Sequence, residues 1–358
     1  MADHTFGGIQ IKNLYKIFGQ NPAAYIDAVR NGLSKSELNA QHHHVLGLRD
    51  INLSIPSGCI QVIMGLSGSG KSTLIRHINR LIDPTAGEVL VDGVDVVKMN
   101  GAQLREFRRH QTAMVFQKFA LLPHRNVLEN TIYGLEVQGI AKSRSEDIAM
   151  GWLERVGLKG FERRYPNQLS GGMQQRVGLA RALSNDAPVL LMDEAYSALD
   201  PLIRTDMQTV LLDLQKEIKK TIVFITHDLD EALRLGDQIA ILRDGEIIQQ
   251  GTSQDVVLRP ADDYVANFVK EVNRGRVVHV EAVMKPLPSG TPVNGAAIAA
   301  GTTIEDALRA LASGAEHGLT VIDAAGKALG RVELRQLAAA MVNSGVSSPP
   351  TRPVSAAK

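Results

Sequence analysis

Residues 65–72 constrain the fold most, because they follow the pattern G-x-x-x-x-G-K-[ST]. The apolar, β-rich stretch 59–64 precedes them, and residues 72–78 carry apolar side chains at helical spacing. A chance Gly/Ser loop is the alternative, which this strand-loop-helix context disfavours. Glycines permit tight turns, so that successive N–H groups and the helix dipole can attract phosphate. The sequence therefore predicts a nucleoside triphosphate site.

This predicted loop assigns roles to particular side chains. Lys71 is expected to reach the β- and γ-phosphate oxygens, and the Ser72 hydroxyl is expected to ligate Mg²⁺. The residues predicted to bind the nucleotide phosphates are Gly65, Ser67, Gly68, Ser69, Gly70, Lys71, Ser72 and Thr73.

Composition excludes several classes of protein. The chain has 358 residues, a formal net charge of +1 and one cysteine, Cys59. At about 100–200 residues per domain, this length predicts roughly two domains, and the charge gives no reason to expect a nucleic-acid partner. A single cysteine excludes internal disulfides. Because no apolar run approaches the roughly 18 residues that cross a bilayer, and residues 1–5 lack the features of a secretion signal, we expect a cytosolic chain with any membrane role through a partner.

Two further strands are predicted to end in polar side chains. The apolar run 188–192 leads into Asp193 and Glu194, and the run 221–226 leads into His227. At the carboxyl edge of a parallel sheet, Asp193 could hold Mg²⁺, while Glu194 polarises the water that attacks the γ-phosphate. His227 could donate to the γ-phosphate; a structural histidine with satisfied hydrogen bonds is the alternative.

A second glycine pair precedes a predicted helix. Ser170, Gly171 and Gly172 stand before a helix that runs through Val177 and Leu183. The N-terminus of such a helix can bind an anion. The alternative is a simple helix cap, since serine is a favoured cap residue.

These motifs, in this order, resemble those of the ATP-binding subunits of ABC transporters over residues 9–272. The resemblance implies an α/β P-loop NTPase (RecA-like) core with an antiparallel β-subdomain and a helical subdomain at about 103–182. It also implies ATP and Mg²⁺ as cofactors. The residues to which it assigns catalytic roles are Lys71, Gln117, Glu194 and His227. The metal ligands that it implies are Ser72, Gln117 and Asp193.

The same resemblance implies two ATP sites in a head-to-tail dimer of this chain. The signature loop 169–173 would cover the γ-phosphate held by the partner's phosphate loop, and the resemblance assigns Ser170, Gly171, Gly172 and Asp200 of the D-loop 197–200 to the nucleotide site. Phe18 takes the place of the aromatic ring that stacks on adenine, and Tyr15 is the alternative. The loop 118–124 after Gln117 is expected to contact an integral membrane permease subunit.

A narrower resemblance is to the ATPase of glycine betaine/proline osmoprotectant importers. It rests on an insertion after Phe18 that includes 21–25 and 32–38, on the motif 193–204 and on a C-terminal extension. The pattern Ser34-x-x-Glu37 predicts a capped helix within the insertion. The likeness implies a peripheral subunit on the cytoplasmic side of the inner membrane, linked indirectly to a periplasmic or extracellular substrate-binding protein. Other small solutes, or a soluble non-transport ATPase, are the alternatives.

The C-terminal part changes character at 286–290, which are rich in proline and glycine. We therefore expect an ATPase domain at 1–275, a second domain at 276–346 and a disordered tail at 347–358. The second domain is predicted to follow the order strand, helix, strand, strand, helix, which resembles one CBS repeat. Such repeats normally pair, so a regulatory role and a packing or dimerisation role are both open.

Overall fold

The structure is a computed structural model that describes residues 7–117, 120–197, 199–288, 290–293, 295–313 and 318–341. The chain forms two compact units, Met1–Gln250 and Gly251–Lys358. Among the described residues, no helix combines the length and the apolar character that a bilayer crossing requires.

A six-stranded sheet forms the centre of the first unit, with the strand order β10-β9-β3-β8-β7-β6. The pairs that join β6, β7, β8, β3 and β9 are all parallel. Most residues of these strands are buried, which is why they read as continuous apolar runs in the sequence. Their bounds are β3 (Ile60–Met64), β6 (Thr112–Val115), β7 (Val189–Asp193), β8 (Thr221–Thr226), β9 (Gln238–Arg243) and β10 (Glu246–Gly251).

A second, antiparallel sheet lies in the same unit, with the strand order β2-β1-β4-β5. The two sheets share one hydrophobic core, to which helix α3 (Lys71–Ile78) contributes Leu74, Ile75 and Ile78. The phosphate loop therefore leads from the parallel sheet into a helix packed between the sheets. The strands are β1 (Ile9–Phe18), β2 (Val45–Ile55), β4 (Ala86–Val91) and β5 (Val94–Asp95).

The insertion between β1 and β2 is helical. It consists of η1 (Pro22–Tyr25), α1 (Ile26–Arg30) and α2 (Lys35–His42). The predicted capping box is confirmed, since the Ser34 hydroxyl accepts from the Glu37 N–H and the Glu37 carboxylate accepts from the Ser34 N–H. Such a box fixes the start of α2.

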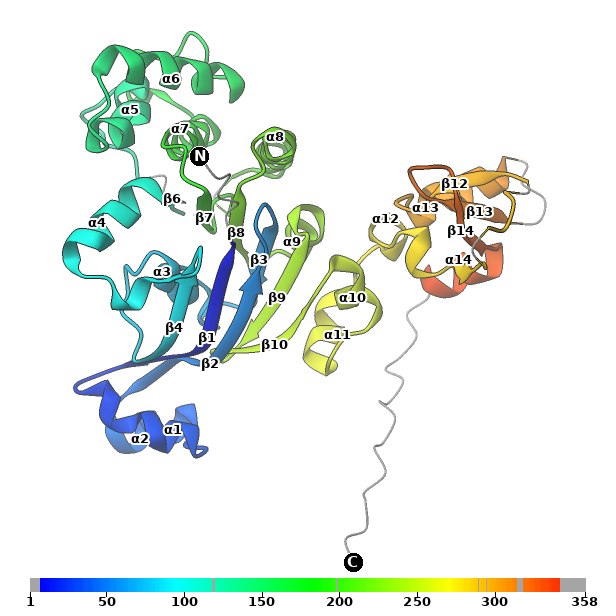
Figure 1. The fold of residues 1–358 in the computed structure, drawn as a ribbon, viewed down its shortest axis with the longest axis horizontal. Coiled ribbons are helices and arrows are strands. Elements are labelled where there is room, and N and C mark those ends of the chain that lie inside the picture. The colour runs from blue at the N-terminus through cyan, green and yellow to red at the C-terminus, as the bar shows by residue number, and fades with distance from the viewer. Residues whose placement is uncertain are drawn as a thin grey trace, which may run out of the picture. The chain divides into compact units, whose positions relative to one another are not determined.

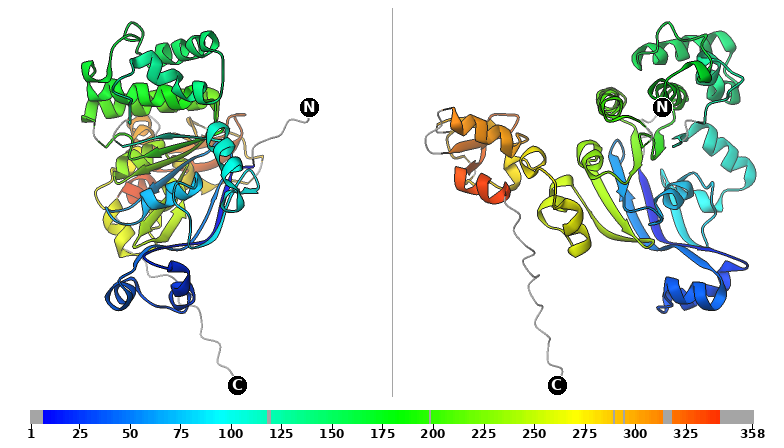
Figure 2. Two further views of the ribbon diagram at one scale, coloured as in Figure 1. Left: turned by 90° about the vertical axis from the view of Figure 1, so that its left-hand side faces the viewer. Right: turned by 180° about the vertical axis from the view of Figure 1, so that it is seen from behind.

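Three helices form a layer of their own, which Figure 1 and Figure 2 show at the opposite end of the unit from α1 and α2. They are α5 (Val127–Val137), α6 (Lys142–Arg155) and α7 (Gly171–Ser184). The segment 103–182, predicted as the helical subdomain, also contains most of α4 (Gly101–His110) and the whole of β6, which pairs with β7. Two more helices, α8 (Pro201–Ile218) and α9 (Leu229–Leu235), follow β7 and β8.

The second unit begins with α10 (Ser253–Leu258), α11 (Asp263–Val269) and α12 (Arg274–Val277). A four-stranded sheet follows, in the order β11-β14-β13-β12. The predicted succession of strand, helix, strand, strand and helix is present, whereas its likeness to a CBS repeat stays a prediction. The elements are β11 (Lys285–Pro286), β12 (Ala297–Ala299), α13 (Ile304–Ala312), β13 (Leu319–Ile322), β14 (Ala328–Val332) and α14 (Leu334–Met341).

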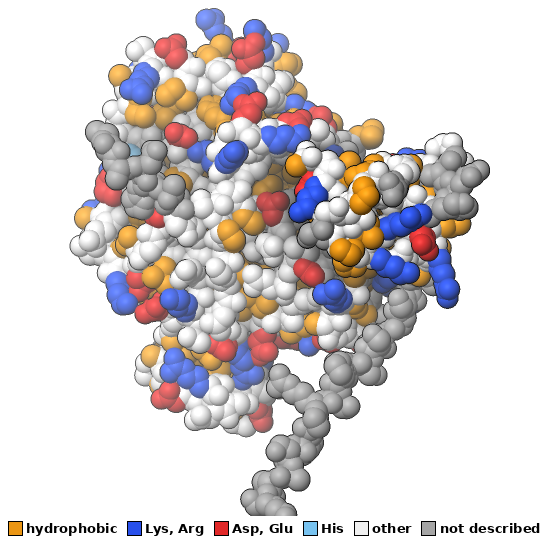
Figure 3. All heavy atoms as spheres, turned by 45° about the vertical axis from the view of Figure 1, so that its right-hand side comes forward, with side chains coloured by type: hydrophobic (Ala, Val, Ile, Leu, Met, Phe, Trp, Pro, Cys, Tyr) orange, Lys and Arg blue, Asp and Glu red, His pale blue; other side chains and the backbone are white. Residues whose placement is uncertain are grey.

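Charged side chains of both signs are mixed over the face drawn in Figure 3, in both units. The tail 347–358 predicted as disordered lies outside the described residues.

A buried histidine on α3 makes stability sensitive to pH. His77 is 1% exposed, and its Nδ1 lies 2.7 Å from the Thr73 carbonyl oxygen. Burial lowers the pKa of His77 to about 4 from an ordinary value of 6.5. The folded state therefore takes up its proton only at lower pH than the unfolded state does, so stability is complete above pH 6.5 and falls between pH 6.5 and about 4.

We expect this group to lower the free energy of unfolding by about 3 kcal/mol over that window, at about 1.36 kcal/mol per pKa unit. Urea unfolding at pH 7, 6 and 5 measures the effect. His77→Gln should flatten the slope, whereas His110→Gln, an exposed histidine on α4, should leave it unchanged. An unaltered slope in His77→Gln would assign the pH dependence to other groups.

Candidate active site

The predicted phosphate loop joins β3 to α3 and depends on glycine backbone geometry. Gly65, Gly68 and Gly70 have φ values of 154°, 78° and 106°. A Cβ at Gly65 would lie 2.3 Å from the Leu242 carbonyl oxygen, and one at Gly70 would lie 2.8 Å from the Gly47 carbonyl oxygen. At Gly65 and Gly70 a residue with a side chain would be strained both by the positive φ and by the close carbonyl oxygen. These glycines therefore fix the path of the loop.

Lys71 is the buried cation of this loop. Its side chain is 4% exposed, and Nζ donates to the carbonyl oxygens of Gly65 at 2.8 Å and Leu66 at 3.0 Å. It also lies 3.7 Å from Oε1 of Glu194. Burial lowers the pKa of Lys71, and the carboxylates of Glu194 and Asp193 raise it. The ammonium group is thus held between the loop and the end of β7.

The end of β7 also faces the start of α3. The Ser72 hydroxyl donates to Oδ1 of Asp193 at 2.7 Å, and Arg76 pairs with Oδ2 of the same carboxylate at 3.0 Å. Hydroxyl and carboxylate oxygens are hard ligands of the kind that Mg²⁺ prefers. Ser72 and Asp193 therefore fit a magnesium ion that is also held by nucleotide phosphates.

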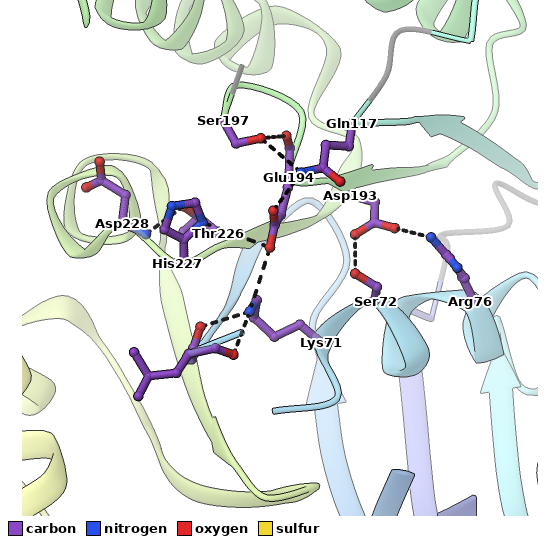
Figure 4. A network of polar contacts seen from close by, with 12 residues as sticks. Lys71, Ser72, Arg76, Gln117, Asp193, Glu194, Ser197, Thr226, His227 and Asp228 are labelled. Atoms are coloured by element: carbon purple, nitrogen blue, oxygen red, sulfur yellow. Dashed lines mark hydrogen bonds and ion pairs between the residues drawn. The ribbon is translucent and has the colours of Figure 1, made fainter. Parts of the chain in front are cut away.

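Glu194 lies at the centre of the polar network drawn in Figure 4. Gln117 donates to its Oε2 at 3.0 Å, Ser197 donates to its carbonyl oxygen at 3.0 Å, and Nδ1 of His227 lies 3.9 Å from its Oε1. Its φ of +46° lies in the left-handed region, which is uncommon for residues other than glycine. This backbone turn directs the carboxylate toward Lys71 directly after the strand.

A cavity of about 460 Å³ adjoins the loop and reaches Phe18. Phe18 is 39% exposed and lines the cavity, whereas Tyr15 is 7% exposed and packs in a hydrophobic cluster with Ile17 and Ile26. The arrangement therefore favours Phe18 as the aromatic ring available to a base. The wall also includes Lys35, Val45, Leu46, Gly47, Ser67, Gly68, Gly70, Lys71, Ser72, Thr73, Gln117 and Glu194.

Comparison with known proteins identifies the family to which the chain is similar. The sequence profile of the family described as ABC transporter matches residues 48–197. The trimethylamine N-oxide transport system ATP-binding protein TmoW of Ruegeria pomeroyi is 43% identical over 315 residues, which cover 88% of this chain and 92% of that protein. The chain belongs to the ABC transporter ATP-binding family.

Two more comparisons support this assignment of the chain to the ABC family. The glycine betaine transport ATP-binding protein OpuAA of Bacillus subtilis is 53% identical over 77% of this chain; the match covers 66% of OpuAA, just under two thirds of its length. The dimeric ATP-binding cassette MJ0796, solved in a post-hydrolysis state with ADP and Pi, is 32% identical with a TM-score of 0.59, covering 68% of this chain and 98% of that cassette.

The remaining predicted site residues of this ABC protein lie apart from the cavity. Ser170 caps α7 by accepting from the Met173 N–H, and both Ser170 and Gly171 are exposed. Gly172 is buried, and it packs so closely against Ile203 that a Cβ there would lie 2.5 Å from that side chain. Asp200 is exposed and precedes α8. None of the four lines the cavity of its own chain, and Ala198 of the D-loop lies outside the described residues.

Sequence reasoning missed several residues of the site. Arg76 stands four residues after Ser72, so helical spacing could have placed both beside Asp193. Arg204 pairs with Asp228 at 2.9 Å and donates to the Leu199 carbonyl oxygen, and no short motif indicates that link. Arg76 links α3 to Asp193 at the end of β7, and Arg204 links the first turn of α8 to Asp228, which follows His227 after β8.

Proposed function

We propose that this chain is the ATP-hydrolysing subunit of an ABC importer that drives uptake of glycine betaine, proline or a related quaternary amine through a separate permease. The observation that carries the ATPase assignment is the convergence of Lys71, Ser72, Asp193, Glu194 and His227 beside one cavity. These five residues come from α3 and from the ends of β7 and β8, at one edge of the parallel sheet. In open parallel α/β sheets, ligands generally bind at the carboxyl ends of the strands.

The proposed reaction is hydrolysis of the γ-phosphate of ATP. Water attacks phosphorus, the bond to the β-phosphate oxygen breaks, and Glu194 accepts the proton of the water. Lys71 binds phosphate oxygens, His227 donates to the γ-phosphate, and Gln117 positions Glu194 until nucleotide is bound. Ser72 and Asp193, with Gln117 as a third candidate, would hold Mg²⁺, which would supply positive charge to the phosphates.

The proposed active form is a dimer of two copies of this chain. Ser170, Gly171 and Asp200 are exposed and lie outside the cavity of their own chain, so they are available to a second copy. MJ0796 is a dimeric cassette, which supports the same assembly here. In this arrangement the signature loop 169–173 of each chain covers the nucleotide bound by the other.

A second cavity, of about 530 Å³, provides a docking surface for the permease. It combines apolar side chains, including Phe116 and Tyr133, with Arg105 and Arg109 of α4. Such a surface suits an apolar segment with acidic flanks. Gln117 directly follows Phe116, so docking there lies next to the network around Glu194. The predicted contact loop contains Ala120 and Leu122 of the cavity wall, while its Lys118 and Phe119 lie outside the described residues.

The relatives point to methylated amines as the transported solutes. OpuAA is named for glycine betaine and TmoW for trimethylamine N-oxide. Glycine betaine has a quaternary ammonium group, and trimethylamine N-oxide is a compact methylated amine of similar polarity. Because TmoW aligns over 92% of its length, trimethylamine N-oxide is the second candidate solute. A permease and a substrate-binding protein outside the membrane would select the solute, and this subunit would act from the cytoplasmic side.

The C-terminal part is proposed to modulate the ATPase. The sheet and the helices α13 and α14 lie within the proposed domain 276–346, and the compact unit that contains them begins earlier, at Gly251, so that it also includes α10, α11 and α12. A regulatory role across the dimer and a packing role both agree with this arrangement, and the likeness to one CBS repeat favours regulation.

Uptake in a strain that lacks its own osmoprotectant importers tests the proposal. The chain is expressed with its permease and substrate-binding protein, and radiolabelled glycine betaine is supplied with and without excess unlabelled trimethylamine N-oxide, carnitine or proline. We expect ATP-dependent uptake of glycine betaine at raised osmolarity. A parallel assay supplies radiolabelled trimethylamine N-oxide instead. Uptake of this solute but not of glycine betaine would select the second candidate, and uptake of neither solute would reject both assignments.

A further inference from the structure

The insertion between β1 and β2 contributes a side chain to the cavity beside the phosphate loop. We propose that Lys35 binds the nucleoside half of the nucleotide, which makes the insertion part of the nucleotide site. This inference rests on the proposed binding of ATP and adds a contact that the motifs of the phosphate loop do not include.

The first support is the position of Lys35 in two adjoining cavities. It lines the cavity of about 460 Å³ together with Phe18 and the phosphate loop. It also lines a neighbouring cavity of about 490 Å³, and the two share Lys35, Val45 and Leu46. The shared wall comes from the insertion and from the start of β2, where Val45 pairs with Phe18, the last residue of β1. Lys35 therefore lies toward the proposed base end of the cavity.

The second support is that the backbone of Lys35 is held in place. It is the first residue of α2, directly after the cap Ser34, and the reciprocal bonds between Ser34 and Glu37 fix this turn. Its Nζ lies 3.6 Å from Oδ1 of Asp244, and the lysine side chain is 40% exposed. The ammonium group is thus close to the cavity, has a weak partner and remains available to a ligand.

The third support is a chain of hydrogen bonds that links the insertion to the phosphate loop. Arg49 on β2 donates to the carbonyl oxygens of Val29 and Leu33 in the insertion, and its N–H donates to the Gly245 carbonyl oxygen. The Gly245 N–H in turn donates to the carbonyl oxygen of Ser69. A Cβ at Gly245 would lie 2.8 Å from the Gly47 carbonyl oxygen, so the segments meet closely.

The chemistry of lysine limits what it can recognise. An ammonium group donates hydrogen bonds and accepts none. Its partners are therefore acceptor atoms. At the base end of the cavity, away from the phosphates, these are ribose oxygens and purine ring nitrogens, which ATP, ADP and GTP share. Because Lys35 is partly exposed and pairs with Asp244, its contribution is smaller than that of a buried cation. We expect Lys35→Ala to raise the dissociation constant about fivefold to tenfold.

Equilibrium titration of the full chain with fluorescent ATP and ADP analogues, checked by displacement with unlabelled nucleotide, tests this inference. Lys35→Ala should weaken the binding of ATP and the binding of ADP by the same factor, because the contact lies away from the γ-phosphate. Lys12→Ala, which removes an exposed lysine on β1 that lines neither cavity, is the matched control. In steady-state assays the KM for ATP should rise in Lys35→Ala with kcat unchanged.

A second variant separates binding from a structural role of the ion pair. Asp244→Asn removes the same pair but keeps Lys35, and asparagine tolerates the φ of +52° at this position. Affinity equal to or above that of the wild type is expected. An Asp244→Asn chain as weak as Lys35→Ala would assign the effect to the ion pair and overturn the inference. The inference would also be overturned if Lys35→Ala kept its nucleotide affinity, or if it lost affinity for ATP but not for ADP. Failure of the wild-type chain to bind any nucleotide would instead reject the proposed function.

Discussion

Glu194→Gln is expected to lower kcat for ATP hydrolysis by about 10²- to 10⁴-fold, the range that a general base contributes. The amide keeps the shape of the side chain and can still contact Gln117, but it cannot accept the proton of the attacking water. The cavity wall and Lys71 are retained, so nucleotide binding should persist. Phosphate release at saturating ATP and Mg²⁺ measures the loss, and equilibrium titration measures the retained affinity.

The same variant also tests the proposed dimer. When hydrolysis is blocked, ATP should hold two copies together, and light scattering should then report a dimer for Glu194→Gln with ATP and a monomer without it. Glu88→Gln is the matched control, since Glu88 is an exposed carboxylate on β4 that lines no part of the cavity. A kcat within about threefold of the wild type would remove Glu194 from the role of general base, for which a loss of at least about 10²-fold is expected.

The fold of the first unit was largely predictable because its central strands are apolar throughout. Residues 221–226 were predicted as a strand and form β8 with the same bounds. The helix after the phosphate loop starts at Lys71 instead of Ser72, a difference of one residue. The antiparallel pairing of β1 with β2, across a helical insertion, could not be derived from residue spacing and came only from the family resemblance.

The candidate site was predictable wherever one short motif contains it. The phosphate loop and the pair Asp193 and Glu194 are such motifs. Lys35 and Arg204 contact residues far along the chain, Asp244 and Asp228, and a single sequence does not indicate such contacts. The positive φ of Glu194 could not be predicted either, because the end of a strand does not indicate the backbone conformation of the next residue. The three-dimensional path of the chain supplies that information.

Lys71→Ala is expected to weaken ATP binding by about 10- to 100-fold or more, since a hydrogen bond to a charged group contributes about 1.5–3 kcal/mol. Lys71 is the buried ammonium group of the loop, and alanine leaves the phosphate oxygens without it. Titration with a fluorescent ATP analogue, with calorimetry as a check, measures the dissociation constant.

The matched control for Lys71→Ala is a lysine that is buried to a similar degree but lies elsewhere. Lys220 is 9% exposed and donates to Asp186 and to the Ala187 carbonyl oxygen. Lys220→Ala should therefore lower the free energy of unfolding, because it leaves the Ala187 carbonyl oxygen without this donor, and should leave ATP affinity unchanged. Affinity lost equally in both variants would show that general destabilisation, and not the phosphate contact, accounts for the effect of Lys71. Affinity retained in Lys71→Ala would show that this loop does not bind the nucleotide. The assignment of the cavity as the nucleotide site would then be wrong.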